Sequence, residues 1–551
     1  MRQAAAISYA SGISDIPLLG QTVGENLERA AERFPDREAL VDCATGRRWT
    51  YAQFDADVDV VARGLLDLGV GKGERVGIWS PNTAEWVLVQ YATAKIGAIL
   101  VNINPAYRTS ELQFALAQSG VRLLVSAERF KTSDYRAMVD EVRGACPNLE
   151  RAVYLETSDW EDLLARGHRT AAEHLRVRAG QLGFDDPINI QYTSGTTGFP
   201  KGATLSHHNI VNNGYFIGEL CRYTETDRVC IPVPFYHCFG MVLGNLACTT
   251  HGACIVIPAP AFDPRATLDA VVAERCSALY GVPTMFIAEL GLADFASYDL
   301  SSLRTGIMAG SPCPVEVMKR VVDDMNMREV TICYGMTETS PVSTQTRSDD
   351  DLERRVATVG RVHPHVEVKI VDPATGLVAQ RGEPGEFCTR GYSVMLGYWN
   401  DPERTAEVID EAGWMHTGDL ATMDAEGYCN IVGRIKDMVI RGGENIYPRE
   451  IEEFLYSHPD IADVQVIGVP DAKYGEELMA WIRLRESAEP ITAESLRQFC
   501  ADRLAHYKIP RYVHLVDDFP MTVTGKVRKV EMREQAIELL GLHDAAGRHH
   551  A

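Results

Sequence analysis

YTSGTTGFPKGA, residues 192–203, follows the strand-like stretch INIQ and has the composition of a loop that binds phosphate. Its glycines allow backbone N–H groups to turn toward an anion, and Lys201 adds a positive charge. It is not a Walker A motif, because that motif requires Gly-Lys-Ser/Thr, whereas Pro200 precedes the lysine and Gly202 follows it. We therefore expect a nucleotide-phosphate site unlike that of P-loop ATPases and kinases, with a Ser/Thr/Gly-rich surface turn as the alternative.

The overall composition is that of a globular protein with more than one hydrophobic core. The chain has 551 residues, of which 46% are hydrophobic and 24% charged, and it exceeds the length that a single core usually serves. Acidic residues outnumber basic ones by 76 to 54, which gives a net charge of -22. This charge disfavours nucleic acid as a partner and requires that an anion such as ATP be bound by local dipoles and a few placed cations.

Cysteine content and hydropathy bear on the compartment in which the protein acts. The 13 cysteines show no C-x-x-C or other Cys/His ligand spacing, which favours a reducing cytosol. The most apolar stretch, roughly residues 241–258, is interrupted by polar side chains and falls short of the ~20 apolar residues that span a bilayer. The first residues lack the charged and apolar regions of a signal peptide. We expect a cytoplasmic protein with no integral membrane segment.

Hydrophobic periodicity along the chain favours a layered α/β architecture. Residues 51–65 repeat apolar side chains at spacings of three and four, as in an amphipathic helix, and RVGIWS (75–80) follows as a short apolar strand. This alternation indicates a large α/β unit. A smaller α/β unit follows, with a helix opened by Pro448 and VQVIGVP (464–470) as a strand. The charged, glycine-containing stretch 433–448 connects the two units.

The phosphate loop and further blocks, in the same order, resemble the adenylate-forming (AMP-binding) superfamily. This superfamily includes acyl-CoA synthetases, firefly-type luciferases and the adenylation domains of peptide synthetases. The resemblance covers nearly the whole chain and is strongest to medium-chain fatty acyl-CoA synthetases. The further blocks are PFYHCFG (234–240), AGSP (309–312), YGMTET (334–339), GYSVMLGYW (391–399), TGDL (417–420), GRIKDMVIRGGENIYP (433–448) and TGKVRK (524–529).

The resemblance implies an α/β adenylate-forming enzyme fold in two parts. Residues 1–435 would form a large N-terminal domain of several subdomains, with the ATP and acyl sites. Residues 436–551 would form a small, mobile C-terminal domain that carries the catalytic lysine. A carboxylate would attack the α-phosphorus of ATP and release diphosphate, and coenzyme A would then take the acyl group. The implied ligands are ATP, Mg²⁺, coenzyme A and a small-molecule carboxylic acid.

Individual residues in these blocks acquire roles through the resemblance. Glu338 would hold Mg²⁺, Tyr334 would offer its face to adenine, and Asp419 with Arg434 would bind the nucleotide. Without the resemblance, these four side chains could also be interpreted as a surface acid, a core tyrosine, a turn aspartate and a solvated charge. The resemblance implies as catalytic residues Lys526, Glu338 and Thr193, and as ATP-binding residues Thr193, Ser194, Gly195, Thr196, Thr197, Gly198, Lys201, Gly310, Ser311, Pro312, Tyr334, Gly335, Met336, Thr337, Glu338, Asp419, Arg434 and Lys526.

The C-terminal part would act in both steps of the reaction. In the family, the lysine that matches Lys526 contacts the carboxylate and α-phosphate during adenylation, where negative charge accumulates. The hinge position falls on Lys436. Gly442 and Gly443 would lie on the loop that meets the pantetheine arm of coenzyme A after the domain rotates.

The acyl site is expected to include the block at 234–240. His237 would form a lid over the acyl pocket, with a hydrogen-bonded interior histidine as the alternative. Adenylation domains that take amino acids usually place an acid in this block, whereas Tyr236 and His237 stand here, and the apolar residues nearby favour an uncharged acyl chain. The expected acyl contacts are His237, Tyr236, Met241 and Gly310.

We predict an ATP-dependent acyl-CoA synthetase that acts through an acyl adenylate on medium-chain fatty acids. An acyl-AMP ligase that loads a carrier protein is one alternative. A non-catalytic member of the fold is another, and the presence of Lys201, Glu338, Asp419, Arg434 and Lys526 argues against it. A luciferase-like oxidation is a further alternative, because nothing in the pattern separates the two kinds of pocket.

Overall fold

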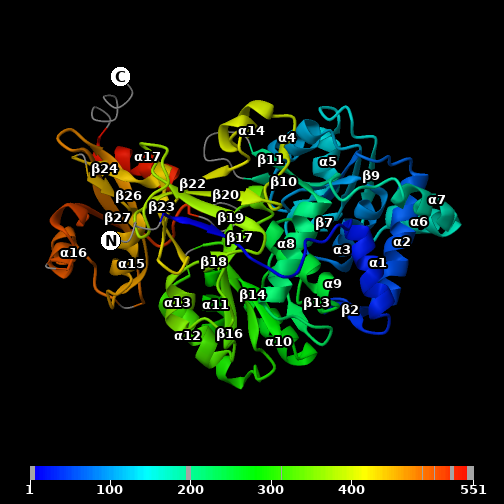
Figure 1. Ribbon diagram of the computed structural model, residues 1–551, viewed down its shortest axis with the longest axis horizontal. Helices are drawn as coiled ribbons and strands as arrows, with labels where there is room; N and C mark the ends of the chain where they lie inside the picture. The colour runs from blue at the N-terminus through cyan, green and yellow to red at the C-terminus, as the bar shows by residue number, and fades with distance from the viewer. Residues whose placement is uncertain are drawn as a thin grey trace, which may run out of the picture.

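The computed structural model describes residues 7–193, 200–311, 313–442, 444–486, 488–501, 503–521 and 527–542. A seven-stranded and a nine-stranded sheet share one hydrophobic core, a five-stranded sheet follows them, and a second five-stranded sheet with its helices lies at one end of the molecule (Figure 1). This arrangement agrees with the layered α/β architecture predicted from the alternating pattern.

The seven-stranded sheet carries the phosphate-loop hairpin. Helix α2 (Tyr51–Asp67) begins where the periodicity predicts, because the side chains of Thr50 and Gln53 cap each other's backbone N–H groups. Helix α3 (Ala84–Ile96) is buried along its whole length in the shared core. The strand order is β21 (Gly397–Tyr398), β11 (Lys201–Ser206), β10 (Pro187–Thr193), β5 (Ile99–Asn102), β4 (Arg75–Trp79), β6 (Leu123–Ser126) and β9 (Arg151–Tyr154), and the other helices of this region are α4 (Thr109–Ser119), α5 (Tyr135–Arg143), α6 (Ser158–Arg169) and α7 (Ala172–Ala179).

The nine-stranded sheet has a parallel centre with antiparallel strands at both edges. Its order is β18 (Arg361–Val362), β17 (Val342–Gln345), β16 (Glu329–Gly335), β15 (Thr305–Ala309), β14 (Ala278–Gly281), β12 (Arg228–Cys230), β13 (Cys254–Ile257), β2 (Glu38–Asp42) and β3 (Arg47–Thr50). The helices of this region are α1 (Val23–Arg33), α8 (His207–Leu220), η1 (Phe239–Leu246), α9 (Ala247–His251), α10 (Pro264–Glu274), α11 (Pro283–Leu290), α12 (Val315–Asp324) and α13 (Leu352–Ala357).

A five-stranded antiparallel sheet leads from the large sheets to the C-terminal part. Its order is β1 (Tyr9–Ser11), β19 (Val366–Val371), β20 (Gly385–Gly391), β22 (Met415–Met423) and β23 (Cys429–Arg434), and helix α14 (Pro402–Val408) lies between β21 and β22 in the chain. Its last strand, β23, ends at Arg434, next to the predicted hinge.

The C-terminal sheet has hydrophobic cores of its own. One core joins it to α15 (Pro448–Leu455) and α16 (Ala493–Cys500), and the other joins it to α17 (Lys529–Leu540). Figure 1 shows these elements gathered at one end of the molecule. Within the described ranges, no helix is both long and apolar enough to cross a bilayer. The strands are β25 (Glu444–Ile446), β24 (Val439–Arg441), β27 (Gly475–Leu484) and β26 (Ile461–Asp471), with β28 (Tyr512–Leu515) paired to β27.

Candidate active site

The nine-stranded sheet presents predicted nucleotide residues at the carboxyl ends of adjacent parallel strands. Gly310 follows β15, Gly335 ends β16, and Glu338 lies in the short 3₁₀-helix η3 (Thr337–Thr339) directly after it. Open α/β sheets usually bind ligands at this edge. Gly310 has φ +92°, and a Cβ at Gly335 would lie 1.7 Å from the carbonyl oxygen of Pro341, so both positions favour glycine. The predicted residues Ser311, Met336 and Thr337 belong to the same edge, and Pro312 lies outside the described residues.

The predicted phosphate loop connects the two strands of the β10–β11 hairpin. The register pairs Thr193 with Lys201, and the Thr193 hydroxyl donates a hydrogen bond of 3.4 Å to the Lys201 carbonyl oxygen. The two ends of the loop therefore lie side by side, next to the edge that carries Gly310 and Glu338. The other predicted phosphate contacts, Ser194, Gly195, Thr196, Thr197 and Gly198, lie outside the described residues.

Glu338 is a buried carboxylate with a neutral hydrogen-bond donor. It is 5% exposed, and the Tyr398 hydroxyl donates to its Oε1 over 2.9 Å. Lys201 Nζ lies 4.9 Å from the centroid of the same Tyr398 ring. In the part of the chain that the structure describes, Glu338 forms no ion pair. This carboxylate fits a Mg²⁺ ligand, because the ion prefers carboxylate and phosphate oxygens together and would supply the missing positive charge.

Tyr334, Asp419 and Arg434 form a connected group on three strands. Pairing of β22 with β23 sets Asp419 opposite Arg434. The Tyr334 hydroxyl donates to Asp419 Oδ2 over 2.7 Å, and Arg434 Nε lies 2.7 Å from Asp419 Oδ1. Asp419 raises the pKa of Arg434, and burial, followed by the same carboxylate, raises the pKa of Tyr334. The group is thus fixed around one buried carboxylate that keeps lone pairs for further hydrogen bonds.

The predicted acyl residues lie between the two large sheets. Tyr236 and His237 precede a helix with π geometry, η1, a feature frequent at functional sites. The Asn102 amide donates to the Tyr236 carbonyl oxygen over 3.0 Å and to the sulfur of buried Met241 over 3.5 Å. The Phe239 N–H donates to His237 Nδ1 over 3.2 Å, so this ring nitrogen is an acceptor. Strand β5 therefore fixes the backbone of the predicted acyl block.

Two of the predicted C-terminal residues, Lys436 and Gly442, follow the strands that carry Tyr334, Asp419 and Arg434. Lys436 lies in the 3₁₀-helix η4 (Ile435–Asp437), between the last strand of one sheet and the first strand of the next. Gly442 follows β24, and its N–H donates to the Tyr474 carbonyl oxygen over 2.7 Å. Gly443 and Lys526 lie outside the described residues.

Comparison with models of protein families shows to which family the chain belongs. The model of the AMP-binding enzyme family matches residues 27–399, and the model of the AMP-binding enzyme C-terminal domain matches residues 450–526. The chain belongs to the AMP-binding enzyme family. The predicted superfamily is thereby confirmed, whereas the domain boundary at residue 435 lies between the two matches and stays a prediction.

Full-length relatives of this AMP-binding enzyme support the assignment. YngI of Bacillus subtilis (strain 168) is 50% identical over 95% of this chain and 99% of its own length. The mitochondrial medium-chain acyl-CoA ligase ACSF2 of Danio rerio is 46% identical over 97% of this chain and 91% of its own. The crystal structure of the anthranilate CoA ligase AuaEII with anthranoyl-AMP matches with a TM-score of 0.84 at 28% identity, covering 95% of this chain and 98% of AuaEII. The predicted adenylate-forming fold is therefore confirmed.

Two features of this AMP-binding enzyme were not predicted from its sequence. Tyr398 belongs to the quoted block GYSVMLGYW, yet only the structure shows that it contacts both Glu338 and Lys201. Gln191 on β10 accepts a hydrogen bond of 3.1 Å from the Cys238 thiol, which ties the phosphate-loop strand to the acyl block. The available signal was the position of both residues inside or next to quoted blocks.

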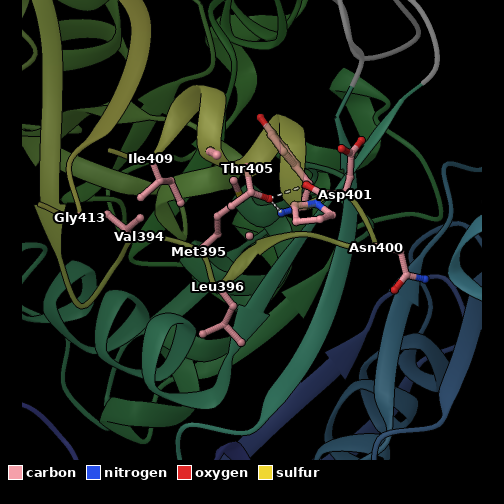
Figure 2. A pocket seen from close by; sticks show the side chains of 12 residues that line it. Val394, Met395, Leu396, Asn400, Asp401, Thr405, Ile409 and Gly413 are labelled. Atoms are coloured by element: carbon pink, nitrogen blue, oxygen red, sulfur yellow. Dashed lines mark hydrogen bonds between the residues drawn. The ribbon is translucent and has the colours of Figure 1, made fainter. Parts of the chain in front are cut away.

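A cavity of about 670 Å³ opens beside the nucleotide residues of this AMP-binding enzyme. It lies between the segment 394–398 and α14, and in Figure 2 the side chains of Met395, Thr405 and Ile409 gather around it. A smaller cavity of about 230 Å³ is lined by Lys201, Trp399 and other residues. Neither cavity is lined by Tyr334 or Asp419, so the positions of the cavities do not mark the nucleoside site.

Glu386, Cys388 and His416 form a group with metal-ligand chemistry that the sequence spacing does not reveal. His416 Nδ1 lies 2.8 Å from Glu386 Oε2 and 3.5 Å from the Cys388 sulfur. The other Glu386 oxygen accepts the Gly418 N–H over 3.0 Å. Protein partners thus account for these ligand atoms, and the group stabilises the β20–β22 pair that leads to Asp419.

Proposed function

We propose that this protein is an AMP-forming acyl-CoA ligase that converts a medium-chain fatty acid, ATP and coenzyme A into acyl-CoA, AMP and diphosphate. The observation that carries the proposal is the group formed by Tyr334, Asp419 and Arg434, in which Tyr334 belongs to β16, the strand that Glu338 follows. Its relatives YngI and ACSF2 match over nearly the full chain, and ACSF2 is a medium-chain acyl-CoA ligase.

The nucleotide is bound by residues that are already held in place. Asp419 accepts from Tyr334 and Arg434, and its remaining lone pairs accept the ribose hydroxyls. The face of Tyr334 lies against adenine, with Gly310 on the other side of the base. Thr193 and Lys201, at the two ends of the phosphate loop, direct a hydroxyl and an ammonium group toward the phosphates. Fixed binding of this kind aligns the α-phosphorus for attack by the carboxylate.

Glu338 and Lys201 place opposite charges near the phosphates. Glu338 would hold Mg²⁺, which when bound neutralises charge on the phosphate oxygens. The carboxylate is suited to this role because it is buried and its hydrogen-bond donor, Tyr398, is neutral.

Residues 436–551 act as a separate domain. Among the residues that the structure describes, their cores include none from the large sheets, and η4 contributes no buried residue. Lys526 acts in adenylation, Lys436 is the hinge, and Gly442 with Gly443 meets the pantetheine arm after rotation. This division allows one site to serve both half-reactions.

The acyl chain lies beside the block 234–240. Tyr236, His237, Met241 and Gly310 line its path, and Tyr236 and His237 stand where amino-acid-activating domains usually place an acid, which favours an uncharged acyl chain. Burial raises the pKa of Tyr236, so its hydroxyl stays neutral. A neutral, partly buried wall of this kind suits an aliphatic chain.

The cytoplasm is the proposed location. All 13 cysteines are free thiols, and most are buried. Thiols in this number suit a reducing compartment.

The test is diphosphate release with ATP and Mg²⁺ across acids from acetate to long-chain, aromatic and amino acids, each with and without coenzyme A. Sustained turnover with medium-chain acids only when coenzyme A is present supports the proposal. A burst that does not depend on coenzyme A would favour a carrier-protein acceptor, and no release with any acid would reject adenylation.

A further inference from the structure

Tyr398 touches both charged side chains of the phosphate site. Its hydroxyl donates to Glu338 Oε1 over 2.9 Å, and its ring lies under Lys201 Nζ at 4.9 Å. The residue is 7% exposed, so its contact with buried Glu338 is shielded from bulk water, whereas Lys201 is half-buried. Among the described residues, neither Lys201 nor Glu338 forms an ion pair, although both contact this one side chain.

The position of Tyr398 is fixed by its neighbours on both sides. Its N–H donates to Thr405 Oγ1 over 2.9 Å, and the register of β21 with β11 pairs Tyr398 with Ala203. The Met395 N–H donates to the Glu338 carbonyl oxygen over 2.9 Å. The segment 395–398 therefore holds the backbone of Glu338 as well as its side chain, and links η3 of one large sheet to the phosphate hairpin of the other.

The chemistry of the two contacts explains why a tyrosine suits this place. A phenol hydroxyl orients a carboxylate without neutralising it, and an aromatic face attracts an ammonium group without donating a proton or a negative charge. Burial and Glu338 raise the pKa of Tyr398, so the hydroxyl remains a donor at neutral pH. A direct ion pair between Lys201 and Glu338 would instead neutralise both groups.

We infer that Tyr398 is a positioning residue that keeps Lys201 and Glu338 apart and oriented, so that the ammonium group stays available to phosphate and the carboxylate to Mg²⁺. This inference rests on the proposed function. The two contacts can be tested separately, because the hydroxyl contacts Glu338 and the ring contacts Lys201. Removing each in turn should therefore have a different effect.

Tyr398→Phe removes the hydroxyl and keeps the ring. We expect the affinity for Mn²⁺, measured by electron paramagnetic resonance with α,β-methylene-ATP present, to fall about tenfold, the size of a lost hydrogen bond to a charged group. The affinity for the analogue without metal should not change. Tyr398→Leu removes the ring as well, so Lys201 pairs with Glu338 and the analogue also binds more weakly.

The matched control is Tyr456→Phe, which removes a half-buried tyrosine hydroxyl hydrogen-bonded to Asp463 in the C-terminal part. It should leave Mn²⁺ affinity unchanged. In a Glu338→Gln background, Tyr398→Phe should have no further effect on Mn²⁺, because the hydroxyl acts through that carboxylate.

Unchanged Mn²⁺ affinity in Tyr398→Phe, an equal loss in Tyr456→Phe, or additive losses in the double variant would each overturn the inference. The binding measurement needs no turnover. Failure of the proposed function, seen as no acid-dependent diphosphate release by the unmodified protein, is therefore distinguishable from failure of this inference.

Discussion

Asp419 and Lys436 lie on opposite sides of the junction between the two five-stranded sheets, and their surroundings differ. Asp419 is 6% exposed and is held by Tyr334 and Arg434, whereas Lys436 is exposed in a three-residue helix that contains no buried residue. The nucleotide residues are thus fixed before ATP arrives, whereas little packing at the junction opposes rotation. Substitutions on the two sides should therefore affect different half-reactions.

The largest expected effect is that of Lys526→Ala. Acid-dependent exchange between diphosphate and ATP should fall about 100- to 1,000-fold, as when one group that stabilises transition-state charge is removed. Formation of thioester from preformed acyl adenylate should continue, because the proposed rotation withdraws Lys526 before that step. Equal loss of both activities would break the assignment of Lys526 to the first step.

Asp419→Ala should impair both half-reactions, whereas substitutions in the C-terminal part should each impair only one. It removes the buried carboxylate that binds Tyr334 and the half-exposed Arg434, so kcat/KM for ATP should fall about 10-fold or more, the size of a lost hydrogen bond to a charged group. Asp294→Ala, which removes an exposed ion pair with Arg265, is the control and should leave the kinetics unchanged. Steady-state kinetics that do not separate the two variants would contradict the nucleotide role of Asp419.

Lys436→Pro tests the other side of the junction. Proline restricts φ and should slow thioester formation by restricting rotation, while adenylation measured by diphosphate exchange is preserved. The effect should be smaller than that of Asp419→Ala, because no ligand contact is lost. Lys436→Ala keeps the backbone free and is the control; if proline and alanine leave thioester turnover equally intact, the hinge is elsewhere.

The smallest expected effect concerns stability in the large part. Glu289 on α11 is 1% exposed, neither carboxyl oxygen has a hydrogen-bond partner among the described residues, and burial raises its pKa well above the ordinary 4.5. Glu289→Met should raise the free energy of unfolding by about 1–3 kcal/mol, the cost of a buried unsatisfied polar group. Denaturant titration measures this change.

The same residue predicts a pH dependence. The folded protein keeps a proton on Glu289 that the unfolded chain releases above about pH 4.5. The free energy of unfolding therefore falls as pH rises from about 4.5 toward the folded-state pKa. Glu289→Gln cannot titrate and should reduce the decline of stability with pH. An unchanged pH slope in this variant would contradict burial of an uncompensated carboxyl group.

The ordered blocks were sufficient to predict the family and the fold, because each block has a distinct local pattern and all occur in a fixed order. The helix at 51–65 follows from its periodicity, and the phosphate loop from glycines that follow an apolar strand. The family and the fold predicted from those blocks are confirmed by the comparisons. The roles of the individual site residues, those of Glu338, Asp419 and Lys526 included, stay predictions.

Other features depend on register between distant strands and could not be predicted from the sequence. Tyr398 meets Glu338 only because β21 pairs with β11 while η3 follows β16. The burial of Glu289 could not be predicted either, because an acid at one position of a short apolar helix is usually expected to face solvent. Nor does the spacing of Glu386, Cys388 and His416 indicate that β20 and β22 bring them together.

The most direct test of the account is to incubate the protein with octanoic acid, ATP and Mg²⁺, analyse the mixture by mass spectrometry, and then add coenzyme A. The account predicts octanoyl adenylate before the addition and its conversion to octanoyl-CoA afterwards. Absence of the adenylate, or an adenylate that coenzyme A does not consume, would contradict it.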